Sequence, residues 1–260
     1  MTARRICYLL LALVAAWAWL VPLPDPAAQD LSASLLPPSA QHWLGTDALG
    51  REVAARLAQA LRISLSLALG AALLAASLGA GLGLLAAWCR GGVERLLLAL
   101  ADAVVALPGL LWVLLLSALA PGQTWPLYLG LVLTAWVEFF RTTRVSAAAL
   151  LGGPQVQSSR LLGFGRLYIV RQHVWPALRG TLLALTALAV CNAVLAVSAL
   201  GFIGVGLRPP QAELGLLMTE AMPYYADAPW MLAAPVLLLL ATVLALQTLS
   251  EKKDNHATGT

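Results

Sequence analysis

The chain has 260 residues, of which 60% are hydrophobic and only 11% are charged, and its net charge is +4. Its mean hydropathy is +0.83, whereas a soluble domain carries about 25% charged residues. This composition excludes an ordinary soluble enzyme, a disordered chain and a nucleic-acid-binding domain. It is also too apolar for an outer-membrane barrel, whose strands alternate polar and apolar residues. We therefore expect an all-α, polytopic bundle of transmembrane helices, because helices pair their own backbone groups in hydrocarbon.

The hydropathy pattern predicts about six spans, since a helix needs about 20 apolar residues to cross a bilayer. The expected spans are residues 6–22, 63–88, 96–119, 127–140, 181–200 and 230–249. The fourth span is the shortest, because Glu138 and Arg141 follow its apolar stretch. The first span also resembles a cleavable secretory signal, since Arg4 and Arg5 precede a short apolar run. That run continues beyond the small-x-small site, which favours an uncleaved membrane anchor.

The spans divide the chain into four expected parts. These are an N-terminal anchor (1–22), an extracytoplasmic segment (23–62), a transmembrane domain (63–250) and a cytoplasmic tail (251–260). Within the transmembrane domain, a long cytoplasmic loop (141–180) holds six arginines and no acidic residue.

The basic residues predict the orientation of the bundle. If the N-terminus is cytoplasmic, six spans place 12 of the 16 Lys and Arg residues on the cytoplasmic side. The remaining four would lie on the outer side of the membrane, and they are Arg51, Arg56, Arg62 and Arg208. Cytoplasmic loops carry an excess of Lys and Arg, so we expect both termini inside.

A stripe of small residues runs along the second expected span. Its members, spaced four apart, are Ala71, Ala75, Gly79, Gly83 and Ala87. Small residues at this spacing let two helix backbones approach closely. We expect this contact inside the same chain, and the alternative is a contact with a partner subunit.

The cytoplasmic loop contains a distinctive pattern. Residues 157–165 read Gln-Ser-Ser-Arg-Leu-Leu-Gly-Phe-Gly, and His173 and Pro176 follow. The pattern predicts a short helix, a break at Gly163 and a second short helix that ends near Pro176. Such a basic loop either lies on anionic lipid or docks on a partner.

This loop resembles the EAA loop of ATP-binding-cassette importer permeases, which reads Glu-Ala-Ala, three residues, Gly and finally His-x-x-Pro. Four positions match, and the sequence Gln-Ser-Ser replaces Glu-Ala-Ala, which removes the charge of the usual Glu. The resemblance implies that the loop is a coupling helix on which a separate ATPase docks. The implied docking residues are Gln157, Ser158, Ser159, Arg160, Gly163, Arg166, His173 and Pro176.

A second stretch narrows the resemblance to one family. Residues 42–52 read His-Trp-Leu-Gly-Thr-Asp-Ala-Leu-Gly-Arg-Glu and are similar to a motif of the dipeptide/oligopeptide/nickel permeases. Residues 201–210 resemble another motif of that family. We expect Thr46 or Asp47 to cap the following helix, and glycines to form tight turns. The family-motif residues with an expected structural role are Gly45, Thr46, Asp47, Gly50, Arg51, Asp102 and Pro108.

The resemblance covers residues 30–250 and implies the fold and function of a type I importer permease. Such a permease lies in the bacterial inner membrane and forms half of a translocation path, with no cofactor and no bound metal of its own. Its implied partners are a second, usually different permease, two cytoplasmic ATPases and an extracytoplasmic solute-binding protein, with no nucleic acid. Family substrates are peptides, nickel and metal chelates, and the segment 36–47 looks slightly more like the nickel-type permeases.

Two other functions remain alternatives. Asp102 and Glu138 fall in expected spans, and intramembrane acids often mark an ion path, which would suit a proton-coupled secondary transporter. We expect instead that Asp102 bonds within the bundle and that Glu138 lies at the inner interface near Arg141. A membrane enzyme is the other alternative, but the sequence has no HExxH or catalytic Ser/His/Asp grouping. It also lacks a Walker GxxxxGK[ST] motif, so ATP hydrolysis would belong to partner subunits.

Overall fold

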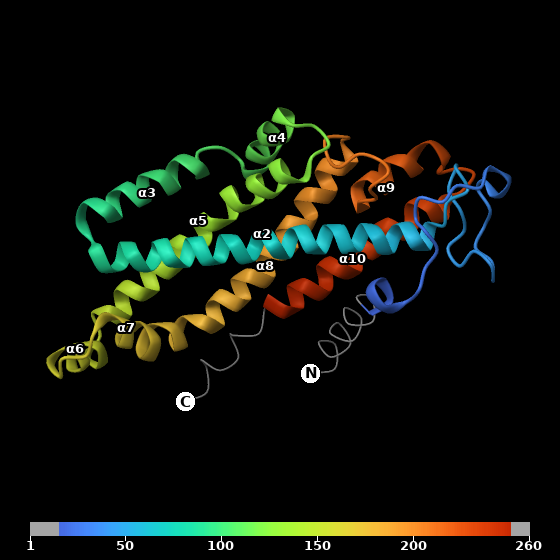
Figure 1. The fold of residues 1–260 in the computed structure, drawn as a ribbon. Coiled ribbons are helices and arrows are strands. Elements are labelled where there is room, and N and C mark those ends of the chain that lie inside the picture. The colour runs from blue at the N-terminus through green and yellow to red at the C-terminus, as the bar shows by residue number, and fades with distance from the viewer. Residues whose placement is uncertain (1–15, 251–260) are drawn as a thin grey trace.

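The computed structural model describes residues 16–250, and within them the fold is helical, without β-strands (Figure 1). The long helices are α2 (Val53–Cys89), α5 (Thr124–Leu151), α8 (Trp175–Phe202) and α10 (Pro229–Ser250). The shorter helices are α3 (Gly91–Val105), α4 (Gly109–Leu119), α6 (Pro154–Leu161), α7 (Arg166–Ile169) and α9 (Leu214–Ala221). Single turns are the 3-10 helices η1 (Leu31–Ala33) and η3 (Met222–Tyr224) and the π-helical turn η2 (Val170–Val174). The prediction of an all-α bundle is confirmed for this part of the chain.

Three helical segments in the described residues are long and apolar enough to cross a membrane. They are Val53–Cys89, Arg166–Phe202 and Pro229–Thr248, and the bent pair α3 and α4 would make a fourth. Helix α5 covers the expected fourth span and is 28 residues long, but it is not among these segments. Most of the expected first span, up to residue 15, lies outside the described residues.

The expected third span, 96–119, is wrong as a single helix. Helices α3 and α4 meet at an angle of 80° across a short break. Pro108 lies in this break in an extended conformation, with φ −53° and ψ 134°. Proline has no backbone N–H and disfavours a helical conformation of the residue before it, so the helix ends and restarts here.

Helix α2 runs through the expected boundary at residue 62 without interruption. It has 37 residues, which corresponds to about 55 Å at 1.5 Å per residue. This exceeds the hydrocarbon thickness of about 30 Å, so one end of α2 extends beyond the bilayer core. The expected extracytoplasmic segment 23–62 therefore ends inside a helix.

The second short helix of the loop 141–180 does not end near Pro176, contrary to expectation. Arg166–Phe202 forms one helical run that passes through the π-helical turn η2. The N–H of Trp175 donates to the carbonyl of Val170, five residues earlier. Pro176 has no N–H to donate, and the widened turn before it accommodates the proline at the second position of α8.

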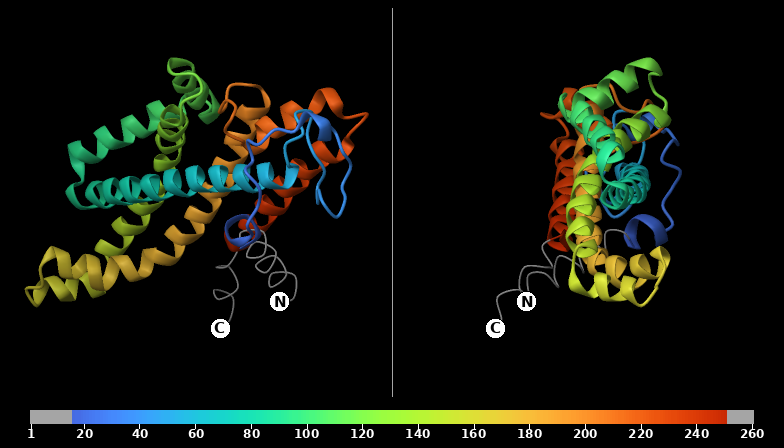
Figure 2. Two further views of the ribbon diagram at one scale, coloured as in Figure 1. Left: turned by 45° about the vertical axis from the view of Figure 1, so that its right-hand side comes forward. Right: turned by 90° about the vertical axis from the view of Figure 1, so that its left-hand side faces the viewer.

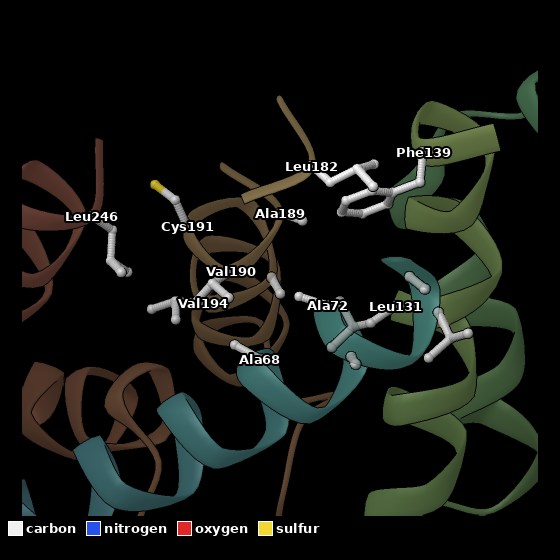
Figure 3. Packing of buried hydrophobic residues seen from close by; sticks show 14 of the residues in the cluster. Ala68, Ala72, Leu131, Phe139, Leu182, Ala189, Val190, Cys191, Val194 and Leu246 are labelled. Carbon is white, nitrogen blue, oxygen red and sulfur yellow. The ribbon is translucent and has the colours of Figure 1, made fainter. Parts of the chain in front are cut away.

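The small residues of α2 pack against α5, which confirms the expected contact inside the chain. All five members of the stripe are buried. A Cβ atom on Gly83 would lie 2.6 Å from the carbonyl oxygen of Phe140, so only glycine permits this approach. Figure 3 shows the surrounding core, in which Ala68 and Ala72 of α2 lie beside Leu131 of α5 and Val190 of α8.

The helices place two loop regions at opposite ends of the molecule. Helices α6 and α7 lie at one end, and α9 lies at the other beside the segment 23–52 (Figure 1, and the left view of Figure 2). Residues singled out from the sequence lie in both regions.

Candidate functional site

The break between α6 and α7 is a defined helix C-cap. Gly163 has φ +81°, and its N–H donates to the carbonyl of Arg160 at 3.0 Å. The N–H of Phe164 donates to the carbonyl of Ser159, also at 3.0 Å. This pair of hydrogen bonds is a Schellman motif, in which the residue at the Gly163 position adopts the left-handed conformation. The motif ends α6 and turns the chain toward α7.

Side-chain contacts hold the two short helices together. The hydroxyl of Ser159 lies 2.9 Å from Nε2 of His173, which joins α6 to η2. The rings of Phe164 and Tyr168 stack at 4.2 Å, and Tyr168 also meets His173 edge-on at 6.1 Å. Beneath them Val156 is buried. The segment 154–174 is therefore a compact folded unit, the knob.

The other predicted docking residues take different positions on the knob. The side chains of Gln157 and Ser158 donate to the carbonyls of Gly152 and Pro154, each at 3.0 Å, so both bond to the backbone nearby. The guanidinium carbons of Arg160 and Arg166 each lie 5.7 Å from the centre of the Trp88 ring. Pro176 lies beyond the knob, in the first turn of α8.

The tip of the knob exposes apolar side chains. Leu161, Leu162 and Leu167 are 89%, 76% and 80% exposed. Contiguous exposed apolar surface rimmed by polar residues marks an interaction site. Arg160 and Arg166 are next to Leu161 and Leu167 in the sequence, so basic residues adjoin the exposed leucines.

The family motif at 42–52 forms a tight loop at the other end of the molecule. Gly45 and Gly50 have φ +74° and +69°, and a Cβ atom on Gly45 would lie 2.5 Å from the carbonyl oxygen of Leu36. The Thr46 hydroxyl donates to the carbonyl of Ala33 and accepts the N–H of Leu36. The expected capping role of Thr46 or Asp47 is wrong, because the N-cap of α2 is Glu52 and has no side-chain cap.

Asp47 instead organises a buried ion network. Its Oδ2 lies 2.6 Å from Nε of Arg51 and 2.9 Å from Nη1 of Arg56. The same Nη1 lies 2.6 Å from Oε2 of Glu220 in α9. The side chains of Asp47 and Arg56 are each only 3% exposed. The network ties the loop to α2 and α9.

Sequence reasoning missed Glu220 and gave Arg56 no role beyond the motif. The role of Arg56 could have been predicted from the sequence, since Arg56 follows Arg51 by five residues and lies in the first turn of α2. Glu220 is 164 residues away from Arg56, and nothing in the local sequence pairs the two.

Glu213 is a second acid that sequence reasoning missed. It is fully buried and caps α9, accepting the N–H groups of Gly215 and Leu216 at 2.9 and 3.3 Å. Burial raises the pKa of Glu213 to about 7, and the two backbone hydrogen bonds limit the rise.

The two remaining motif residues lie between these ends. Asp102 Oδ1 lies 2.6 Å from Nη2 of Arg141, and both side chains are exposed. Pro108 stands at the bend between α3 and α4. Glu138 lines a cavity between α4, α5 and α8. Within residues 16–250, no three His, Cys, Asp or Glu side chains gather to hold a metal ion.

Comparison with known proteins gives the family. The chain is 33% identical to the nickel transport system permease protein NikC of Escherichia coli (strain K12) over 257 residues, which covers 97% of this chain and 92% of NikC. It is 33% identical to the di/tripeptide transport system permease protein DppC of Pseudomonas aeruginosa (strain UCBPP-PA14), over 90% of this chain and 78% of DppC. It is 31% identical to the metal-staphylopine import system permease protein CntC of Staphylococcus aureus (strain NCTC 8325 / PS 47), over 95% of this chain and 84% of CntC.

The profile of one protein family matches residues 79–253, which are most of the chain and include the knob. The relatives extend the likeness to the motif at 42–52, since each alignment covers at least nine tenths of the chain. The chain belongs to the family of binding-protein-dependent transport system inner membrane components.

Proposed function

We propose that this chain is one of two permease subunits of an ATP-driven importer for peptides or for nickel and other metal chelates. The named relatives transport nickel, di- and tripeptides and metal-staphylopine. The slight likeness of the segment 36–47 to nickel-type permeases favours a metal substrate. The second subunit is a different permease, and an extracytoplasmic binding protein delivers the solute.

The observation that carries this proposal is the exposed leucine tip of the knob. A secondary transporter has no ATPase partner for a folded knob with three exposed leucines, whereas an importer needs a surface on which its ATPase docks. Docking covers Leu161, Leu162 and Leu167 and offsets the cost of their exposure. When the two ATPases close, the knob follows, and α8 transmits the movement because it continues from the knob.

The docking residues of the knob proposed from the sequence divide into three groups. Gly163, Ser159 and His173 fix the shape of the knob through the Schellman turn and the hydroxyl–imidazole contact. Arg160 and Arg166 form its basic rim, while the side chains of Gln157 and Ser158 bond locally. ATP hydrolysis belongs to the partner subunits.

The proposed orientation has both termini and the knob in the cytoplasm. The knob carries Arg160, Arg166 and Arg171, whereas Arg51 and Arg56 contact Glu220 of α9, toward the other end. The positive-inside rule supports this arrangement. Reporter fusions after residues 40 and 215 should report the outside, and fusions at residues 92 and 165 the inside. An inside signal at residue 40 would contradict the orientation.

Co-purification with the ATPase subunits tests the proposal. The double variant Leu161→Asp, Leu167→Asp places two charges on the tip and should abolish capture of the ATPases from detergent-solubilised membranes. Leu31→Asp is the matched control, because Leu31 is 71% exposed but lies in η1, far from the knob. Equal ATPase capture by both variants would refute docking at the knob.

The proton-coupled alternative has less support. Asp102 pairs with Arg141 on an exposed surface, and Glu138 lines an open cavity, so neither acid is enclosed as a buried proton carrier. The family to which the chain belongs transports with a binding protein.

A further inference from the structure

A partly polar cavity lies between α4, α5 and α8, with a volume of about 240 Å³. Its walls are mainly small or apolar, and its polar side chains are Thr134, Glu138 and Asn192. Glu138 follows Thr124, the first residue of α5, by 14 residues and precedes the last, Leu151, by 13. At 1.5 Å per residue it lies about 20 Å from either end, near the middle of the helix.

Each of the three helices lines the cavity with residues from one of its faces. Thr134 and Glu138 are four residues apart on α5, so they lie one above the other. On α8 the cavity face is formed by Ala189, Asn192, Ala193 and Ala196, which share one side at helical spacing. In Figure 3, Ala189 lies on the side of α8 toward Phe139 of α5. Cys191 points the other way and its Sγ contacts the Val243 carbonyl at 3.9 Å.

The two longer polar side chains of the cavity are accessible from outside the chain. Glu138 and Asn192 are both exposed, and no Lys or Arg is among the residues that line the cavity in the described chain. The hydroxyl of Thr134 donates to the backbone of its own helix. A charged side chain that faces acyl chains is costly, and such residues face a water-filled cavity or a protein neighbour instead. The face of α4, α5 and α8 therefore does not face lipid.

Electrostatics decides which solute this cavity suits. The cavity wall offers a carboxylate, a carboxamide and a hydroxyl, but no cationic side chain. The nearest cation on α5, Arg141, is held by Asp102 at 2.6 Å. In a cleft with low-dielectric walls, an uncompensated carboxylate raises the local concentration of positive groups.

We infer that Glu138 and Asn192 contact the solute during its passage and favour a solute that carries a positive charge. A peptide ammonium group and a chelated divalent cation share this chemistry. The inference rests on the proposed function, because it assigns the open face of α4, α5 and α8 to the translocation path. Asn192 offers both a donor and an acceptor for the polar part of the same solute.

Thiol labelling tests the site without knowledge of the solute. Asn192→Cys is made in a chain whose Cys7, Cys89 and Cys191 are replaced by alanine, and the assembled importer is treated with two reagents. One is a quaternary-ammonium methanethiosulfonate and the other its sulfonate analogue, with and without trapped ATP. Each rate is divided by the same reagent's rate with free cysteine. On this scale the cationic reagent should react about tenfold faster than the sulfonate, because the carboxylate of Glu138 concentrates cations locally. Adding Glu138→Gln should remove this preference.

The control chain keeps Cys191 and Asn192, and only Cys7 and Cys89 are replaced by alanine. It should not react, since Cys191 is fully buried although it is adjacent to position 192. Equal relative rates for both reagents with Glu138 present would overturn the inference. Absence of reaction at position 192 in both nucleotide states would also overturn it.

Uptake provides the second test, with Ni²⁺ alone and the dipeptide Ala-Ala alone as probes in reconstituted vesicles. Glu138→Gln should slow ATP-dependent uptake of the transported probe about tenfold at limiting concentration, which corresponds to about 1.4 kcal/mol. ATPase co-purification should stay unchanged, and Glu138→Asp should restore part of the rate. Asp227→Asn, an exposed acid in the loop before α10, is the matched control.

The two proposals fail in different ways. If the wild-type importer takes up neither probe with ATP, free nickel and Ala-Ala are not its substrates, and the labelling result still decides the role of Glu138. If the wild type transports a probe and Glu138→Gln transports it equally well, the inference is overturned while the proposed function stands.

Discussion

Replacement of Asp47 by Asn tests whether the buried ion network holds the loop 42–52 in place. Asp47 Oδ1 accepts the N–H groups of Leu49 and Arg51, and Oδ2 accepts from the guanidinium groups of Arg51 and Arg56. An asparagine oxygen can still accept the backbone donors. The change therefore acts mainly on the two charged contacts.

The expected cost follows from the burial of the network. Removal of one partner from a buried ion pair leaves an uncompensated charge and costs about 3–5 kcal/mol. Glu220 still pairs with Arg56 and lies 3.3 Å from Arg51, so the lower figure applies. About 3 kcal/mol corresponds to a change of about 100-fold in the equilibrium constant for opening of the loop.

Amide hydrogen exchange measures this opening locally. The N–H of Thr46 donates to Leu36 and that of Val53 donates to Gly45, so both amides report on the loop. Both should exchange about 100-fold faster in Asp47→Asn if exchange occurs through loop opening. Asp25→Asn, which removes an exposed carboxylate from the same segment, should leave their exchange unchanged. Wild-type exchange in Asp47→Asn would refute the stabilising role of the network.

Three further predictions follow from the packing and charges. Overpacking in Gly83→Leu should lower the free energy of unfolding, measured in detergent, by about 1–3 kcal/mol. Gly81→Leu should not lower it, because no atom lies within 4 Å of an added Cβ there, and equal effects would contradict the α2–α5 contact. Because the pKa of Glu213 rises from about 4.5 to about 7 on folding, stability should fall as the pH rises through that window. A lower melting temperature at pH 8 than at pH 5 checks this, and Glu213→Gln should reduce the difference. Asp102→Asn should retain ATP-dependent uptake, because its pair with Arg141 is exposed; loss of uptake together with a need for a proton gradient would favour the proton-coupled alternative.

Local sequence patterns predicted the features that depend on local physics. The apolar composition predicted the helical bundle, and Gly163 predicted the break after α6 because a positive φ suits a residue without a side chain. The spacing of Gly79 and Gly83 predicted the close contact between α2 and another helix.

Features that depend on tertiary context were not predictable in the same way. The polar residues of the motif at 42–52 suggested a helix cap, but Asp47 pairs instead with Arg56, which also pairs with Glu220 on a distant helix. Pro108 was placed inside a span because composition alone cannot distinguish a straight helix from one that bends by 80°. Pro176 suggested a helix end, but the π-helical turn before it absorbs the missing hydrogen bond.

The central claim is that the knob couples a separate ATPase to transport. ATP-dependent uptake by the complete importer in vesicles tests it most directly, with Gly163→Val compared with Gly165→Val. Valine at position 163 must adopt φ near +81°, which is strongly disfavoured for a β-branched residue. At position 165 φ is −74° and no atom lies within 4 Å of an added Cβ, so valine fits.

The account predicts that Gly165→Val takes up solute normally. Gly163→Val should insert at the wild-type level but should lose ATPase binding, or hydrolyse ATP without uptake. Full ATP-dependent uptake by Gly163→Val, with the ATPase subunits bound, would contradict the claim that this knob is the coupling element.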